Sequence, residues 1–328
     1  MLEANIKIKK DGYVDEYPEF SELADTQMEI FWPWNEIKVE KDKHDLLTNC
    51  NEAETHGIVT TLKLFTKYET FIGEEYWGNR IVKAYPHVGP IRMASSFAHV
   101  ELNSHGPFYD KINKELGLSN YKFYQSYLND DVLKGRVNFL DEMLSTEDDE
   151  LATSVFSIME GAVLYSNFAY LKSFQSNGKN KIPNIVRGLN MSSRDENLHS
   201  IGGALLVNTA LKEQQRSEYE KKMLYEAVRT AVHTIKEHEF AIISKTVEKG
   251  EPEGITAHQL RQFVLSRLNI CLQQLNYPKE FEVTYNPIAE WFYKGINDYQ
   301  MNDFFQGVGR EYSRDWDREK FVFKRKTT

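Results

Sequence analysis

Acidic and imidazole side chains recur at helical spacing in this chain of 328 residues. Glu196 and His199 stand at i and i+3, and Glu101 and His105 stand at i and i+4, so each pair lies on one face of a helix. A carboxylate and an imidazole that share a face can bind one metal ion together. Such pairs also occur by chance on solvated helix surfaces, so neither pair alone predicts a metal site.

Two further acids, Glu160 and Glu69, lie in strongly apolar segments, residues 155–165 and 65–71. A carboxylate is rarely buried without a partner or a metal ion, because removing its charge from water is costly. The alternative for each is an exposed position on a polar helix face. The apolar flanks of Glu160 leave little polar face for it, which favours a functional interpretation.

Taken together, these acids and histidines form a recognisable ligand set. One acid from each of two helices, with a Glu/His pair from each of two others, is the inventory of a ferritin-like di-metal carboxylate bundle. Carboxylate oxygens with two imidazoles suit iron or manganese, and four carboxylates would nearly neutralise two divalent ions. The predicted metal ligands are Glu69, Glu101, His105, Glu160, Glu196 and His199.

The elements that must hold these side chains in place are long helices. Apolar residues recur at i, i+3 and i+4 over residues 58–72, which is the period of a helix with one buried face. Residues 145–148 and 256–259 have the spacing of helix-capping signals. Further helices are expected over residues 89–116, 155–174, 185–211, 216–249 and 256–275.

Strand signals are few and short, so the predicted fold class is all-α. We expect a ferritin-like bundle of long helices in a single domain, residues 1–307, in which residues 1–50 form an irregular lead-in with short helices. Residues 308–328 are charged and lose the helical period, which predicts a flexible, mobile C-terminal tail.

Composition excludes several classes of function. The formal net charge of −9 argues against a nucleic-acid-binding body. No run of about 20 apolar residues occurs, so no membrane span is expected, and the N-terminus lacks the features of a signal peptide. The two cysteines, Cys50 and Cys271, lack metal-type spacing, which favours a reduced cytoplasmic setting.

With these motifs assembled, the chain resembles the small, radical-generating subunit of class I ribonucleotide reductase over nearly its whole length. Glu160 followed by residues 194–199 matches the second ligand half of that family. In the first half, Tyr109 follows His105 at the family's four-residue spacing, and Glu69 fits the first acid.

The resemblance implies a function for this chain and a role for several residues. A di-metal site (iron, manganese or both) would generate a tyrosyl radical on Tyr109, which passes to a cysteine of a separate large subunit that reduces ribonucleotides. Trp32, Asp195 and Tyr312 would be the transfer steps, the tail of residues 308–328 would contact the large subunit, and the chain would form a homodimer. Without the resemblance, Trp32 is better interpreted as a buried aromatic anchor and Tyr312 as a solvated tail residue.

Two details of the radical site are also expected. Leu164 and Phe168, one and two helical turns beyond Glu160, are candidates for the apolar wall that protects the radical. Asp195 is expected to accept a hydrogen bond from His105 or from His199, and so to couple the metals to Trp32.

One spacing departs from the family pattern. The family has three residues from Glu to His in its first pair, whereas Glu101 and His105 are four apart, and Pro107 lies in the same helix. We expect a π-type bulge near residues 102–105 to absorb the additional residue. The alternatives are that Glu101 coordinates differently or that His99 takes part. The basic end of the chain also differs from the acidic tails usual in the family.

Two other functions fit the same ligand inventory. A di-metal oxidase or hydroxylase acting on a bound hydrocarbon would need an apolar channel to the metals and no Tyr109. A non-catalytic metal-storage protein would give no role to Trp32 or to residues 303–312.

Overall fold

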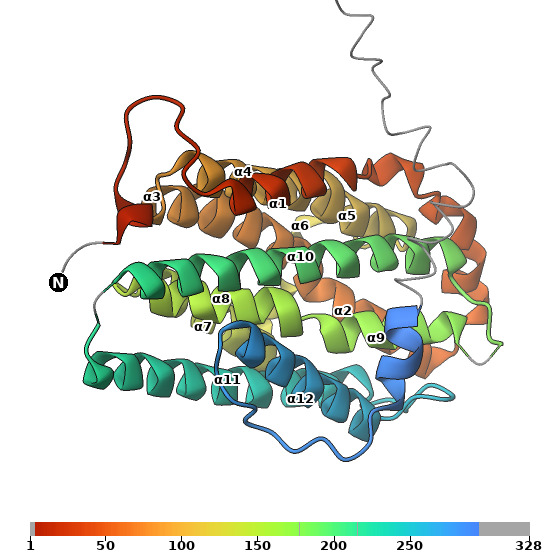
Figure 1. Cartoon of the computed structure of the whole chain (residues 1–328). Coiled ribbons are helices and arrows are strands. Elements are labelled where there is room, and N and C mark those ends of the chain that lie inside the picture. The colour runs from red at the N-terminus through yellow and green to blue at the C-terminus, as the bar shows by residue number, and fades with distance from the viewer. Residues whose placement is uncertain (1–3, 177, 215, 295–328) are drawn as a thin grey trace, which may run out of the picture.

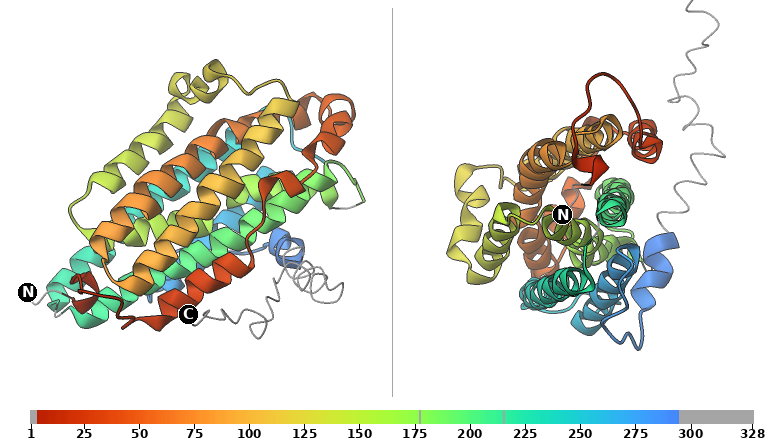
Figure 2. Two further views of the ribbon diagram at one scale, coloured as in Figure 1. Left: turned by 90° about the horizontal axis from the view of Figure 1, so that it is seen from above. Right: turned by 60° about the vertical axis from the view of Figure 1, so that its left-hand side comes forward.

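The computed structural model describes residues 4–176, 178–214 and 216–294, and within these ranges the chain forms helices and no strand. The long helices lie side by side in one bundle, which is seen from above and turned toward its end in Figure 2. This confirms the all-α, ferritin-like prediction. The predicted tail, residues 308–328 with Tyr312, lies outside the described residues. None of the described helices is both long and apolar enough to cross a membrane.

Most of the bundle is built from α-helices, labelled in Figure 1. They are α1 (Pro18–Glu29), α2 (Glu52–Phe71), α3 (Val82–Ala84), α4 (Val88–Val100), α5 (Gly106–Glu115), α6 (Tyr121–Tyr124), α7 (Asp131–Ser145), α8 (Asp149–Ala162), α9 (Tyr165–Lys172), α10 (Pro183–Glu213), α11 (Glu218–Thr246) and α12 (Ala257–Gln274). Residues 287–294 are also helical.

Shorter or wider helical segments connect these elements. The 3-10 helices are η1 (Asn5–Lys7), η2 (Trp34–Glu36), η3 (Val39–Asp42), η7 (Ser126–Asn129) and η8 (Ser173–Gln175). The π-helices are η4 (Asp45–Asn49), η5 (Ile72–Ile81) and η6 (Glu101–His105).

Capping explains where two of the long helices begin. Thr256 and Gln259 form the predicted capping box of α12. The predicted cap at Ser145 is wrong, because Ser145 ends α7 and its hydroxyl donates to the carbonyl of Asp141. Asp148 caps α8 instead, and its side chain accepts a hydrogen bond from the backbone N–H of Leu151 at 3.0 Å.

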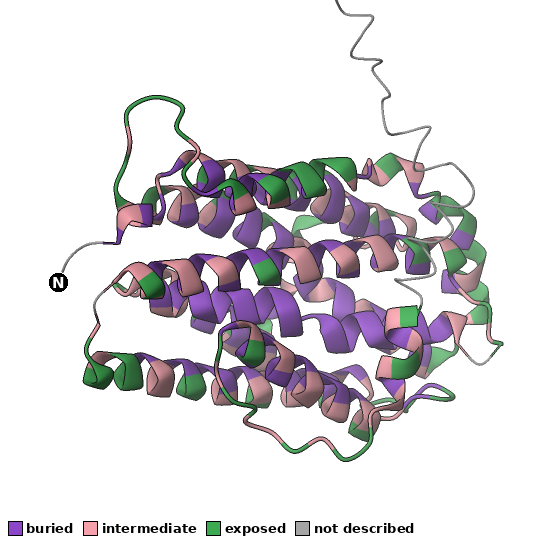
Figure 3. Ribbon diagram, in the orientation of Figure 1, coloured by how far each residue is buried: buried purple, intermediate pink, exposed green. Residues whose placement is uncertain are grey.

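The helix predicted over residues 155–174 is interrupted. It ends as α8 at Ala162 and resumes as α9 at Tyr165, with Leu164 between them at φ 69°, in the left-handed region. The apolar period continues across the break, so the sequence pattern does not reveal it. Every residue from Ala152 to Ala162 is buried, and Figure 3 shows α8 in purple along most of its length.

The π-helix η6 confirms the bulge expected between Glu101 and His105. A second π-helix, η5, continues α2 and was not predicted. A π-helix bonds i to i+5 and therefore turns less per residue than an α-helix. This brings Trp77 back toward the face that carries Glu69, from which an unbroken α-helix would turn it by about 80°.

Candidate metal centre

The six predicted ligands come together at the centre of the bundle. α2 supplies Glu69, η6 supplies Glu101 and His105, α8 supplies Glu160, and α10 supplies Glu196 and His199. They form two overlapping groups, in each of which the ligand atoms lie within 4.8 Å of one another. The groups are Glu69, Glu101, His105 and Glu196, and Glu101, Glu160, Glu196 and His199.

Both histidines direct the same ring nitrogen into the cluster. Nδ1 of His105 lies 3.0 Å from Glu101 Oε2 and 3.3 Å from Glu196 Oε1. Nδ1 of His199 lies 2.8 Å from Glu101 Oε1 and 3.7 Å from Glu196 Oε2. Glu101 and Glu196 therefore stand between the two imidazoles, with Glu69 on one side of them and Glu160 on the other. His99, the alternative ligand, is exposed and outside the cluster.

The hydrogen bonding of the cluster fits a pair of metal ions. Glu69 Oε1, Glu101 Oε1, Glu196 Oε1 and His199 Nδ1 are buried and form no hydrogen bond of normal geometry, although Glu101 Oε1 and His199 Nδ1 lie 2.8 Å apart. Buried polar atoms are normally paired, because an unpaired one loses its hydration without compensation. Here the unpaired atoms belong to the residues grouped around one point, and oxygen and imidazole donors suit iron or manganese.

The proton balance of the cluster leads to the same conclusion. Burial, and then repulsion from Glu101, holds the pKa of Glu69 well above its usual value. Burial and repulsion from Glu196 do the same to the pKa of Glu160. Glu69 and Glu160 therefore resist ionisation, and bound cations can replace the protons that otherwise neutralise these two carboxylates.

The outward nitrogens of the two histidines reach different partners. Asp195 Oδ2 accepts from Nε2 of His105 at 3.2 Å and from Nε1 of Trp32 at 2.7 Å. Of the two alternatives for Asp195, the contact is therefore with His105. Nε2 of His199 lies 3.1 Å from Oε1 of Gln27. Trp32 is buried, with its ring centroid 5.7 Å from that of His105.

Tyr109 lies beside the cluster and is sealed from solvent. Its side chain is fully buried, and its hydroxyl donates to Ser192 Oγ at 3.1 Å. The ring of Phe65 packs edge-on against it at a centroid distance of 4.5 Å. Burial, and to a lesser degree the nearby carboxylate of Glu69, holds the pKa of Tyr109 well above its usual value, so the phenol stays protonated at neutral pH.

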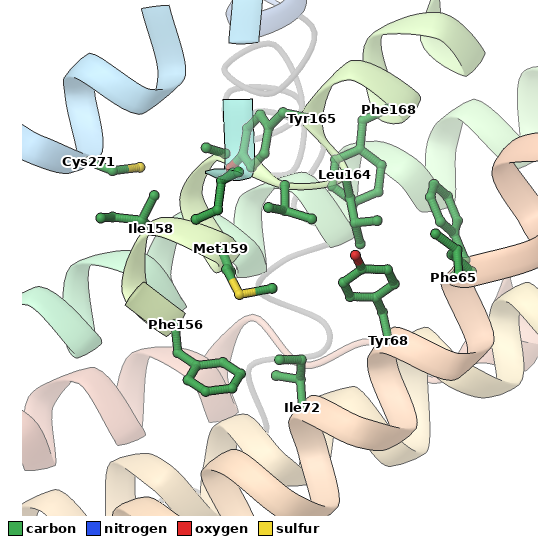
Figure 4. Packing of buried hydrophobic residues seen from close by; sticks show 14 of the residues in the cluster. Phe65, Tyr68, Ile72, Phe156, Ile158, Met159, Leu164, Tyr165, Phe168 and Cys271 are labelled. Carbon is green, nitrogen blue, oxygen red and sulfur yellow. The ribbon is translucent and has the colours of Figure 1, made fainter. Parts of the chain in front are cut away.

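The two residues expected to form the apolar wall lie at the start of α9, where Phe168 N–H donates to the carbonyl of Leu164 at 2.7 Å. Phe168 packs on Phe65 at a centroid distance of 5.7 Å, and Phe65 in turn packs on Tyr109. Leu164 lies at the break between α8 and α9, so the expectation that it stands one helical turn beyond Glu160 is wrong. Figure 4 shows Leu164 facing the hydroxyl of Tyr68 across the packed interior.

A small cavity adjoins the cluster. Its volume is about 20 Å³, which holds one water-sized molecule. It is lined by Tyr68, Glu69, Ile72, Met159, Glu160, Val163, Leu164 and Glu196. Three of the predicted ligands thus meet a space that is apolar on its other sides.

Sequence reasoning missed several residues that support the site. Trp77 donates from Nε1 to Glu160 Oε1 at 2.6 Å, and the unpredicted π-helix hid its position. Phe65 stands four residues before Glu69 and Ser192 four before Glu196, so helical spacing could have identified both. Gln27 is distant in sequence from every ligand, and no local signal points to it.

Comparison with known proteins agrees with this geometry. The model of the family described as "Ribonucleotide reductase, small chain" matches residues 13–287, most of the chain. The chain belongs to this family. Membership makes it a subunit of an oxidoreductase and favours reductase function over the oxidase, hydroxylase and storage alternatives.

Individual proteins share low sequence identity with this chain, but the similarity extends over most of its length. A probable ribonucleoside-diphosphate reductase small subunit of Invertebrate iridescent virus 3 is 25% identical over 327 residues, covering 92% of this chain and 85% of that one. The dimanganese(II)-NrdF of Streptococcus sanguinis has a TM-score of 0.71 at 18% identity, covering 88% of this chain and 99% of that one.

The ribonucleotide reductase Rnr4 homodimer of Saccharomyces cerevisiae is a further structural neighbour. Its TM-score is 0.69 at 17% identity, over 90% of this chain and 91% of that one. At these identities the two solved structures establish a shared fold and nothing finer.

Proposed function

We propose that this ribonucleotide reductase small chain binds two metal ions in the carboxylate–histidine cluster and stores a tyrosyl radical on Tyr109. The observation that carries the proposal is the contact series around His105. Its Nδ1 faces the carboxylates, while its Nε2 reaches Trp32 through Asp195. A buried tyrosine and a buried tryptophan therefore flank the same predicted ligands.

The ligands proposed for the ions are the six residues of the two groups described above. With dioxygen or a related oxidant as the electron acceptor, two bound iron or manganese ions would supply the oxidising power that a phenol requires. The dimanganese neighbour supports manganese as one of the possible metals. The small cavity beside Glu69, Glu160 and Glu196 has room for a molecule of the size of water or dioxygen.

The protein's part is to control the proton and to exclude water. Because the pKa of Tyr109 is raised, its phenol is protonated and must release a proton when it loses an electron. Ser192 Oγ, at 3.1 Å, is the first acceptor on the route of that proton. Phe65 and Phe168 cover the ring on one side, which keeps water and reductants away from the radical.

Radical transfer to a large subunit is proposed to run through Asp195, Trp32 and Tyr312. Arg194 contributes to this route by donating to Asp195 Oδ1 at 3.2 Å and to the carbonyl of Ile30 at 2.7 Å. These bonds fix Asp195 relative to the segment that carries Trp32. The relatives' names support ribonucleoside diphosphates as the substrate of the assembled enzyme.

A homodimer working in the cytoplasm is also proposed. The yeast neighbour is a homodimer, and the cytoplasmic setting rests on the cysteine usage. Light scattering that shows a monomer at micromolar concentration would count against the dimer.

The reductase assay with the cognate large subunit tests the proposed function. Tyr109→Phe and Trp32→Phe should each abolish deoxyribonucleotide formation, because one removes the radical site and the other a transfer step. Tyr121→Phe, at an exposed tyrosine, is the matched control and should keep wild-type activity. Activity retained in Tyr109→Phe would contradict the proposal that Tyr109 carries the radical.

A further inference from the structure

A buried arginine near the cluster has no place in the function proposed so far. Arg267 lies on α12 and is 2% exposed, yet among the described residues its hydrogen bonds go to a carbonyl, a hydroxyl and an amide, and no carboxylate forms an ion pair with it. A buried charge is costly unless hydrogen bonds or rings stabilise it. The centre of its guanidinium lies 4.1 Å from the ring centroid of Tyr165, and its N–H groups reach three separate segments.

Two of those segments carry proposed metal ligands. Arg267 Nε donates to the carbonyl of Gly161 at 2.7 Å, and Nη2 donates to Asn197 Oδ1 at 3.3 Å. Gly161 directly follows Glu160, and Asn197 directly follows Glu196. The Gly161 carbonyl lies in the last turn of α8, where carbonyls have no partner within the helix. One planar group thus spans the two ligand-bearing helices.

Helices α8, α10 and α12 are tightly packed at Gly161. A Cβ atom at Gly161 would lie 2.4 Å from both Cys271 Sγ on α12 and Ser200 Oγ on α10. A small change in the separation of α8 and α10 would therefore move the two groups on these helices to which Arg267 donates. Cations bound between Glu160 and Glu196 would attract both carboxylates and so favour a close approach of α8 and α10.

The third partner of Arg267 lies in the helical segment 287–294. Nη1 donates to the hydroxyl of Tyr293 at 2.9 Å. The neighbouring Phe292 packs on Phe263 at a centroid distance of 4.8 Å. A second buried basic side chain, that of Lys172, donates to the Phe292 carbonyl at 3.2 Å, and its Nζ lies 3.6 Å from the Phe292 ring centroid.

We propose that Arg267 is a positioning residue that couples the metal centre to segment 287–294. It ties the residues after Glu160 and Glu196 to Tyr293, so metal binding and the ordering of this segment favour each other. The inference rests on the proposed metal site. Because coupling between two sites is reciprocal, loosening Tyr293 must weaken metal binding by the factor by which metal binding tightens the segment.

Hydrogen exchange of the full-length protein, with and without Mn(II), tests this coupling. In the wild type, Mn(II) should slow amide exchange in residues 287–294 by about fivefold or more. In Tyr293→Phe, which removes only the acceptor hydroxyl, this slowing should disappear and Mn(II) affinity should fall by a similar factor. Arg267→Lys keeps the positive charge but cannot donate to all three partners at once, so it should behave in the same way if it folds.

Tyr285→Phe is the matched control, because Tyr285 is exposed and precedes the same segment; it should keep the wild-type response. About two Mn(II) bound per chain with no change in exchange would overturn the coupling and leave the metal site standing. An undiminished Mn(II) response in Tyr293→Phe would also overturn it. Failure of the wild type to bind Mn(II) would refute the metal site and the coupling together.

Discussion

Among the single residues of the site, the four glutamates fall into two classes. Glu101 and Glu196 belong to both ligand groups, whereas Glu69 and Glu160 belong to one each. Burial would raise the pKa of Glu101, but His105 and His199 beside it hold that pKa well below its usual value. Glu69 meets only His105 and Glu160 meets only His199, which do not offset burial and repulsion from the neighbouring acid, so the pKa values of these outer acids are raised. The outer pair should therefore depend most on bound cations to ionise.

Metal content tests the outer acids and the tryptophan behind one of them. Glu160→Ala removes a charged ligand and should lower metal content from about two ions per chain to one or fewer, measured by elemental analysis. Trp77→Phe removes the hydrogen bond to Glu160 together with part of a buried ring, and should weaken metal affinity about 10–100-fold. Trp34→Phe, at a half-buried tryptophan away from the cluster, is the control. Unchanged metal content in Glu160→Ala would remove this residue from the ligand set.

Lys172 gives a prediction for the pH dependence of stability. Burial holds the pKa of Lys172 well below its usual value, while in the unfolded chain the ammonium has a pKa of ~10.4. Between these two pKa values the unfolded state binds more protons, so the free energy of unfolding should rise with pH up to about 10.4. Lys172→Met should flatten this rise in urea unfolding curves. The exposed Lys9→Met should keep it. Parallel wild-type and Lys172→Met profiles would refute the lowered pKa of Lys172.

At the scale of elements, the N-terminal cap of α8 stabilises the helix that carries Glu160. Asp148→Ala removes the side chain that accepts from Leu151 N–H and should cost about 1 kcal/mol of stability. Ser145→Ala should cost much less, because the hydroxyl of Ser145 bonds to α7 instead. Denaturant unfolding of both variants measures the difference. A larger loss in Ser145→Ala would restore the cap that the sequence pattern favoured.

The elements also show what the sequence could and could not predict. Helical period and the spacing of acids and histidines predicted the bundle and the six residues that the structure brings together. The π-bulge at residues 101–105 was predictable because Glu101 and His105 are separated by one residue more than the Glu/His pair of the family that the chain resembles. The break at Leu164 and the π-helix at residues 72–81 interrupt apolar runs without changing their composition. Tertiary packing sets them, so Trp77 and the position of Leu164 were not predictable.

At the scale of the whole molecule, the metal site is enclosed by the bundle, so the proposed large subunit cannot contact it directly. The ligands are buried, and Trp32 is 3% exposed. A radical on Tyr109 can therefore act on a large subunit only through a transfer route that leaves the bundle. Arg267 and Lys172 contact segment 287–294, and the coupling proposed for Arg267 would place a metal-responsive contact just before the tail that is proposed to contact the large subunit.

Truncation after residue 310 tests the proposed role of the C-terminal segment. The shortened chain should still bind metal and form the radical, because every described ligand lies before residue 295. It should lose reductase activity with the large subunit, because Tyr312 is absent. Tyr312→Phe in the full chain separates the two roles, since it should bind the large subunit normally and remain inactive. Undiminished activity in the truncated chain would refute the role given to the tail.

The most direct test of the central claim is low-temperature EPR spectroscopy combined with metal analysis. The apo-protein is loaded with Fe(II) or Mn(II) and exposed to dioxygen, and Tyr109→Phe is treated in parallel. The account predicts about two metal ions per chain in both proteins and a tyrosyl signal in the wild type alone. The same signal in Tyr109→Phe, or a wild type that binds no metal, would contradict it.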